Sequence, residues 1–137
     1  WGYAVPPEQQ RFARARVERA GVDLVHGHSS HHPRGMEVHQ GRLILYGCGD
    51  LINDYEGIGD HRGFRSDLSL MYFPHLDPRS GRLLRLELVP MQMRRFRLAH
   101  PAPADREWLL DAVERACAPF GTRLVQHDDG PPALWWP

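Results

Sequence analysis

The feature that most constrains the fold is a change of hydrophobic periodicity along the chain. Ala13, Val17 and Ala20 recur at helical spacing within residues 7–20, and residues 105–118 repeat the helical pattern. The runs between and after these two segments are short and strand-like. Because helical and strand-like periods alternate along the sequence, we expect an α/β fold with at least two helices.

Strand-like runs and turn residues predict the sheet. The runs cover residues 22–26, 36–39, 42–46, 68–73, 82–88 and 122–126. Gly41 lies in the short link after the second run, and residues 77–81 link the fourth and fifth, so both links predict hairpins. We expect one sheet that contains the runs beginning at 22, 42, 68, 82 and 122.

Two further places carry specific expectations about the backbone. Pro90 follows the run 82–88 and lacks an N–H, so it predicts a bulge or an edge position. Residues 127–137 contain the run Asp-Asp-Gly-Pro-Pro and are expected to be irregular. The indole rings of Trp135 and Trp136 would then cover an apolar patch.

A histidine-rich loop follows the apolar run 22–26. His28 and His31 lie three residues apart, with Gly27 before them and two serines between them. Neutral imidazole is a common ligand of zinc, iron and manganese, and a loop that leaves a strand can turn two rings toward one point. The spacing therefore predicts two metal ligands, whereas chance clustering among nine histidines is the alternative.

The residues around this loop resemble a known family. Residues 27–35 read G-H-S-S-H-H-P-R-G and are followed by Glu37, by the run 42–46 and by Gly-Cys-Gly-Asp at 47–50. This order resembles the carboxyl-terminal half of the CapA family of poly-γ-glutamate capsule-synthesis proteins, whose fold is that of the calcineurin-like metallophosphoesterases. Trp1 and Gly2 resemble the remainder of a His-Trp-Gly motif of that family.

The resemblance implies that these 137 residues are the carboxyl-terminal portion of a longer protein. The Gly-Asp, Glu-bearing and Asn-Asn-His motifs of the family, which supply other metal ligands, do not occur before Trp1. We therefore expect residues 1–137 to form a single domain, a partial metallophosphoesterase sandwich that holds about half of its two-sheet core.

The resemblance also implies a chemistry. His28 and His31 would bind divalent ions, manganese, zinc or iron, with two ions in the complete protein. Such a protein would be a metal-dependent hydrolase or transferase, and this portion alone would be inactive. The alternative is a non-catalytic scaffold or export component that binds an anionic polymer. A third hypothesis is a small structural zinc site made by His28, His31 and Cys48.

Other positions in the region are also candidates for the site. Asp50 could position a catalytic water or be an ordinary turn residue. His32 could contact substrate or support a ligand, and Arg34 could hold a phosphate or carboxylate with its planar fork or cap its own loop. The acidic residues within 54–56 could face the same cleft.

Composition excludes several classes of function. The 17 basic residues, all Arg, balance 17 acidic ones, which argues against a nucleic-acid partner. The family resemblance implies an anionic small molecule or polymer as the substrate. No apolar stretch reaches the length of a membrane helix. Cys48 and Cys117 form no C-x-x-C pair and are expected to be free thiols. An exposed sheet edge, where further residues would dock, would favour oligomers.

Overall fold

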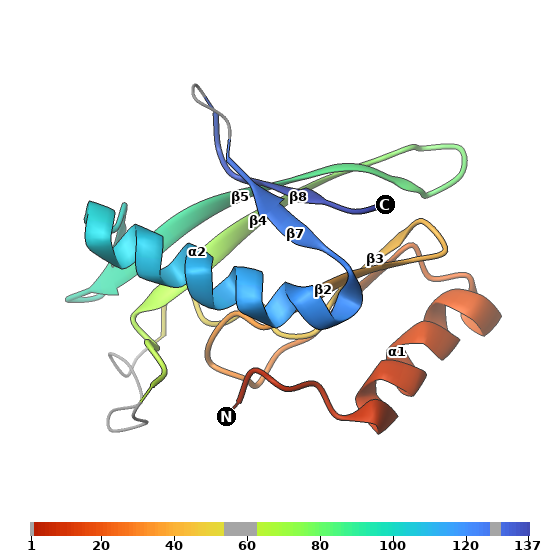
Figure 1. Ribbon diagram of the computed structural model, residues 1–137, viewed down its shortest axis with the longest axis horizontal. Coiled ribbons are helices and arrows are strands. Elements are labelled where there is room, and N and C mark those ends of the chain that lie inside the picture. The colour runs from red at the N-terminus through yellow and green to blue at the C-terminus, as the bar shows by residue number, and fades with distance from the viewer. Residues whose placement is uncertain (1, 54–62, 127–129) are drawn as a thin grey trace.

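Two β-sheets and two α-helices make up the computed structural model, which describes residues 2–53, 63–126 and 130–137. Figure 1 shows helix α2 lying along one side of the sheets, with α1 beside the smaller sheet at the other end of the molecule. The predicted α/β class is confirmed, and the arrangement is compatible with part of a sandwich. No helix in the described segments is long and apolar enough to cross a membrane.

The amino-terminal sheet is mixed and follows helix α1 (Pro7–Ala20). The helix ends at Gly21, whose φ of 65° is the left-handed conformation that glycine adopts without strain. The sheet contains β1 (Leu24–His26), β2 (Met36–His39) and β3 (Arg42–Leu45) in the order β1-β3-β2. Strand β1 runs parallel to β3, and β2 runs antiparallel to it.

Successive side chains of β3 belong alternately to two hydrophobic clusters. Ile44 packs with Ala13 and Val17 of α1, whereas Leu43 and Leu45 belong to the main core. Both leucines and Ile44 are at most 2% exposed. Because successive strand residues point to opposite faces, α1 covers one face of this sheet and the main core covers the other.

The carboxyl-terminal sheet is larger. Its strands are β4 (Leu68–Leu76), β5 (Leu83–Arg94), β6 (Arg97–Ala99), β7 (Arg123–Val125) and β8 (Ala133–Trp135). Their order is β4-β5-β8-β7, and β6 pairs with β5 beyond this path. Helix α2 (Pro103–Cys117) continues into the 3-10 turn η1 (Ala118–Phe120) before β7. Leu109, Val113 and Cys117 of α2 pack in the main core with leucines of β4 and β5.

Two backbone expectations need correction, and the structure decides between the two alternatives at Pro90. The strands form two sheets and not one: β1, β2 and β3 make up the first, and the strands from β4 onward make up the second. The tail is not wholly irregular, since β8 pairs with β7 and, at Glu87, with β5. No bulge occurs at Pro90, which pairs with Leu70. The irregularity lies between His75 and Leu76 instead.

Pro90 is tolerated because of where it falls on β5. On the side of β5 that faces away from β4, β8 pairs with Glu87 of β5. On the same side, β6 pairs with β5 only from Gln92 onward. The missing N–H of Pro90 therefore leaves no ladder hydrogen bond unmade there, as expected for a local edge position.

Candidate functional site

The loop of residues 27–35, here called the histidine loop, is fixed to the end of β3 by backbone hydrogen bonds. Gly27 N–H donates to Leu45 O over 2.7 Å, and Arg34 N–H donates to Gly47 O over 2.9 Å. A Cβ at Gly27 would lie 2.6 Å from Tyr46 O, so only glycine permits this close approach. The loop is therefore anchored at both ends against the same segment.

Between these anchors the backbone is strained at two positions. Ser29 and His31 have φ values of 70° and 59°. These values lie in the left-handed region, which residues other than glycine rarely adopt. Each such residue costs roughly 1–3 kcal/mol and persists only where its surroundings fix it. Strain of this kind clusters at functional sites, and here it flanks the middle of the predicted metal-binding motif.

A carboxylate holds the ring of His31. Its Nδ1 lies 2.8 Å from Asp50 Oδ2, and Asn53 Nδ2 donates to the same oxygen over 3.0 Å. Asp50 accepts from Nδ1–H, which leaves Nε2 as the lone-pair nitrogen of the neutral ring. A carboxylate behind histidine is the usual arrangement that orients an imidazole toward a metal. Asp50 is thus placed to position His31, and its predicted contact with a catalytic water stays a prediction.

His28 has different surroundings. The residue is exposed, its Nδ1 lies 2.9 Å from Ser29 Oγ, and it lines a polar cavity on one side of the histidine loop. His31 does not line that cavity. The convergence of the two rings on one ion stays a prediction.

His32 is built into the interior. It is 1% exposed, and its ring stacks on Phe64 at a centroid distance of 4.9 Å. Its Nδ1 donates to Pro33 O over 2.9 Å, and Gly2 N–H donates to its Nε2 over 3.3 Å. Burial lowers the pKa of His32, which favours the neutral ring. This geometry does not support the predicted substrate contact, because solvent barely reaches the ring.

Arg34 ties the amino-terminal segment to the histidine loop. Its terminal nitrogens donate to Gln9 Oε1, over 3.2 Å, and to Ala4 O. Its Nε is buried and has no hydrogen-bond partner among the described residues. Burial lowers the pKa of Arg34. The side chain therefore does not cap its own loop, and it retains a donor that protein groups leave unused.

The chemistry of these donors fits part of a metal centre. The two imidazoles are suitable ligands, and one of them is oriented by a carboxylate. Within residues 2–53, 63–126 and 130–137, however, no three His, Cys, Asp or Glu side chains gather in a metal-binding arrangement. The predicted zinc site of His28, His31 and Cys48 is therefore wrong. Burial also raises the pKa of the Cys48 thiol to about 12, which disfavours the thiolate that zinc needs.

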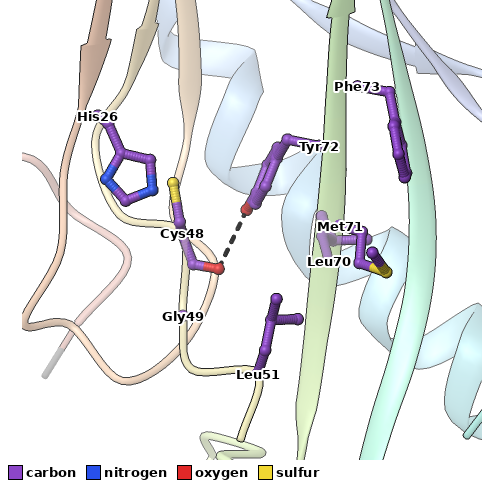
Figure 2. Close-up of a pocket in the computed structure, with 8 residues that line it drawn as sticks. All are labelled: His26, Cys48, Gly49, Leu51, Leu70, Met71, Tyr72 and Phe73. Carbon is purple, nitrogen blue, oxygen red and sulfur yellow. Dashed lines mark hydrogen bonds between the residues drawn. The ribbon is translucent and has the colours of Figure 1, made fainter. Parts of the chain in front are cut away.

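An apolar crevice lies on the other side of Cys48. Figure 2 shows Cys48 and His26 facing Tyr72 and Leu70 across it. The crevice has a volume of about 290 Å³ and separates the end of β1 from β4. The Tyr72 hydroxyl donates to Cys48 O over 3.5 Å, a long hydrogen bond that spans the two sheets. Cys48 and Cys117 are buried free thiols. The prediction that they form no disulfide is confirmed.

Sequence reasoning missed several residues that support the site. Asn53 holds Asp50, Gln9 holds Arg34, and Phe64 packs on His32. Asn53 follows Asp50 by three residues in a polar segment, a turn-like spacing that gives a weak local signal. Gln9 and Phe64 carry no such signal, since 25 and 32 positions of sequence separate them from their partners. The candidate residues within 54–56 lie outside the described part of the chain.

Comparisons with known proteins agree with the resemblance seen in the sequence. Residues 1–55 match the family model described as bacterial capsule synthesis protein PGA_cap. Probable polyglutamine synthesis accessory proteins from two strains of Mycobacterium tuberculosis are each 49% identical over 129 residues. Each match covers 94% of this chain and 34% of the relative, so the chain spans about a third of the length of these relatives.

Proposed function

We propose that this chain, which resembles bacterial capsule-synthesis proteins over residues 1–55 and is similar to two polyglutamine synthesis accessory proteins, is part of an accessory protein for the synthesis of an anionic polymer of the poly-γ-glutamate type. In this proposal His28 and His31 contribute ligands to a divalent metal centre of manganese, zinc or iron. Residues outside these 137 would supply the other ligands.

The contact between His31 and Asp50 carries the metal part of the proposal. At 2.8 Å the carboxylate fixes the ring and its tautomer, and removing such a partner typically lowers metal affinity about 10–100-fold. The backbone strain at Ser29 and His31 supports the same assignment, because the fold maintains a costly loop conformation at the motif.

A bound pair of divalent ions would supply Lewis-acid activation of water for hydrolysis at a phosphoryl or acyl group. The residues of this chain would hold imidazole nitrogens in place and keep their tautomers fixed. Asp50 would do so for His31.

A non-catalytic form of the same role is the second candidate. The observation that favours it is that the two similar relatives are described as accessory proteins, a description that names no catalytic activity. A scaffold that binds the polymer needs only a weak or single-ion site. A content of two ions per complete protein would favour catalysis, whereas one ion or none would favour the scaffold.

Paramagnetic broadening by Mn²⁺ tests whether the histidine loop binds metal, because it detects weak sites. Titration of the 137-residue chain should broaden the ring resonances of His28 and His31 first. Asp50→Asn should weaken the effect by about tenfold or more, since the substituted amide no longer presents a carboxylate to Nδ1.

The matched control is His26→Ala, because His26 is exposed and ends β1 just before the loop. This variant should leave the broadening at His28 and His31 unchanged. Equal broadening at all histidines, or no effect of His28→Ala and His31→Ala on Mn²⁺ affinity, would contradict the proposal.

A further inference from the structure

A polar cavity of about 320 Å³ lies between the amino-terminal segment and the histidine loop. Gln9, His28, Ser29, Ser30 and Arg34 line it, together with small residues of the amino-terminal segment. No Asp or Glu is among the lining residues. Among the lining residues that the structure describes, the guanidinium of Arg34 is the one permanent formal charge.

The charge of Arg34 is not compensated within the described residues. Arg14, Arg42 and Arg65 each have a carboxylate oxygen within 3.3 Å, whereas Arg34 forms no such ion pair. Its hydrogen-bond acceptors are the neutral oxygens of Gln9 and Ala4, and its buried Nε has no partner in the described chain. A partly buried cation without a counter-charge is costly, so an anion in the adjoining cavity would be stabilised.

We propose that this cavity binds a carboxylate group of the substrate, with Arg34 as the charge partner and Ser29 and His28 as neutral hydrogen-bonding groups. The proposal rests on the proposed function and names the chemical class that the site would recognise. One guanidinium balances one carboxylate, whereas a phosphate dianion would leave a negative charge in a cavity with no second formal cation.

The ligand probe is a γ-linked triglutamate, and its counterpart is the same γ-linked peptide with every free carboxylate converted to a carboxamide, here called the amidated peptide. NMR titrations of the isotope-labelled 137-residue chain should be made with EDTA present, so that metal binding plays no part. Triglutamate should produce saturable shifts at Arg34 Nε–H and at the amides of Ser29 and Ser30. The amidated peptide should bind at least about tenfold more weakly, because it offers no charged acceptor to the guanidinium.

Two variants locate the binding group. Arg34→Gln should weaken triglutamate binding about tenfold or more, and Arg34→Lys should restore part of the loss. Arg42→Gln is the matched control, because Arg42 also has a buried nitrogen without a partner but is paired with Asp23. It should bind triglutamate as the unchanged chain does. Ser29→Ala, which leaves the contacts of Arg34 to Ala4 and Gln9 in place, should weaken binding without loosening the amino-terminal segment.

Several results would overturn the inference. These are equal affinity for the two tripeptides, shifts confined to other surfaces, and triglutamate affinity unchanged in both Arg34→Gln and Ser29→Ala. Tighter binding of inorganic phosphate than of triglutamate would reassign the cavity to phosphate. If the chain binds Mn²⁺ at the histidine loop but does not bind triglutamate in the presence of EDTA, this inference is contradicted. The metal proposal is then unaffected.

Discussion

At the scale of single residues, the neighbours His31 and His32 have opposite environments. His31 is partly exposed and oriented by Asp50, whereas His32 is buried and bonded through both ring nitrogens. The positive φ of His31 reverses the backbone between them and helps to separate the two side chains. One ring is thus oriented near the surface by a carboxylate, and the other is packed inside and holds the loop.

The structural role of His32 predicts a large loss of stability on truncation. His32→Ala removes a buried ring and leaves Pro33 O and Gly2 N–H without their partner, so the free energy of unfolding should fall by about 3 kcal/mol. His26→Ala, at an exposed position, should change it by no more than about 0.5 kcal/mol. Urea unfolding followed by circular dichroism gives both values, and similar losses for the two variants would contradict the assignment.

At the scale of elements, a buried carboxylate joins α1 to the amino-terminal sheet. Glu37 of β2 is 6% exposed and accepts hydrogen bonds from Arg14 Nε, over 2.9 Å, and from the Tyr46 hydroxyl, over 2.6 Å. Burial and the contact with Glu37 raise the pKa of Tyr46 well above its usual value. The hydrophobic contacts of Ala13 and Val17 determine which face of α1 packs on the sheet. The hydrogen bond from Arg14 to Glu37 adds a directional contact between them.

Glu37→Ala should therefore destabilise the chain by about 1–3 kcal/mol, because it leaves a buried hydroxyl and a guanidinium without their acceptor. The comparison is Glu18→Ala, which removes a contact between exposed Glu18 and His39 and should cost about 0.5 kcal/mol or less. Thermal unfolding of both variants checks the difference. A loss no greater for Glu37→Ala than for Glu18→Ala would show that α1 is held by apolar contacts alone.

A second polar cluster fastens the segment before β4 to the start of α2. Arg65 contacts Asp67 at 2.7 Å and Asp105 at 2.8 Å. Burial by itself raises the pKa of Asp67, but hydrogen bonds from Arg65 and Gln92 outweigh it and hold the pKa below its usual value. The folded state therefore keeps this carboxylate ionised at a pH where the unfolded state already binds a proton.

The sign of this shift predicts an acid-sensitive contribution to stability. It is fully present above the unfolded pKa, about 3.9, and is lost as the pH falls through the lower folded value. Urea unfolding between about pH 3 and pH 5 should show a shallower pH dependence for Asp67→Asn than for the unchanged chain. Asp111→Asn, at an exposed position of α2, should keep the original dependence. Identical curves for all three proteins would contradict the role of Asp67.

The sequence predicted elements better than their assembly, for a physical reason. Helices α1 and α2 follow from contacts three and four residues apart, which periodicity records directly. The short β8 is preceded by turn residues and acquires its pairing from Arg123 to Val125, a contact that no local pattern encodes. The same limit applies to the site. The motif identified His31, but Asp50 lies 19 positions away in sequence, so the local pattern does not show the contact between them.

At the scale of the whole molecule, the two sheets and α2 share one core, while the chain spans about a third of its relatives. Strand β4 is at the edge of its sheet in the described chain, and Phe73 on it is 44% exposed beside the apolar crevice. Oligomer formation through this edge stays a prediction from the sequence. The histidine loop and both cavities lie within a part of the protein that forms its own core.

We expect the 137-residue chain alone to lack substantial hydrolase activity. Two imidazoles leave most of a metal's coordination to water, and the described residues gather no third ligand. Assays with manganese, zinc or iron on a phosphodiester and on a γ-glutamyl amide should show no turnover above the metal alone. Turnover that disappears in His28→Ala would show instead that a working centre lies within this chain.

We propose that the histidine loop presents two imidazoles to one divalent ion. X-ray absorption spectroscopy of the chain loaded with zinc measures this directly. The account predicts two imidazole nitrogens per zinc at about 2.0–2.1 Å, with oxygen atoms completing the shell. This signature should disappear in the double variant His28→Ala, His31→Ala. A spectrum with only oxygen scatterers, a sulfur at about 2.3 Å, or an imidazole signal unchanged in the double variant would contradict it.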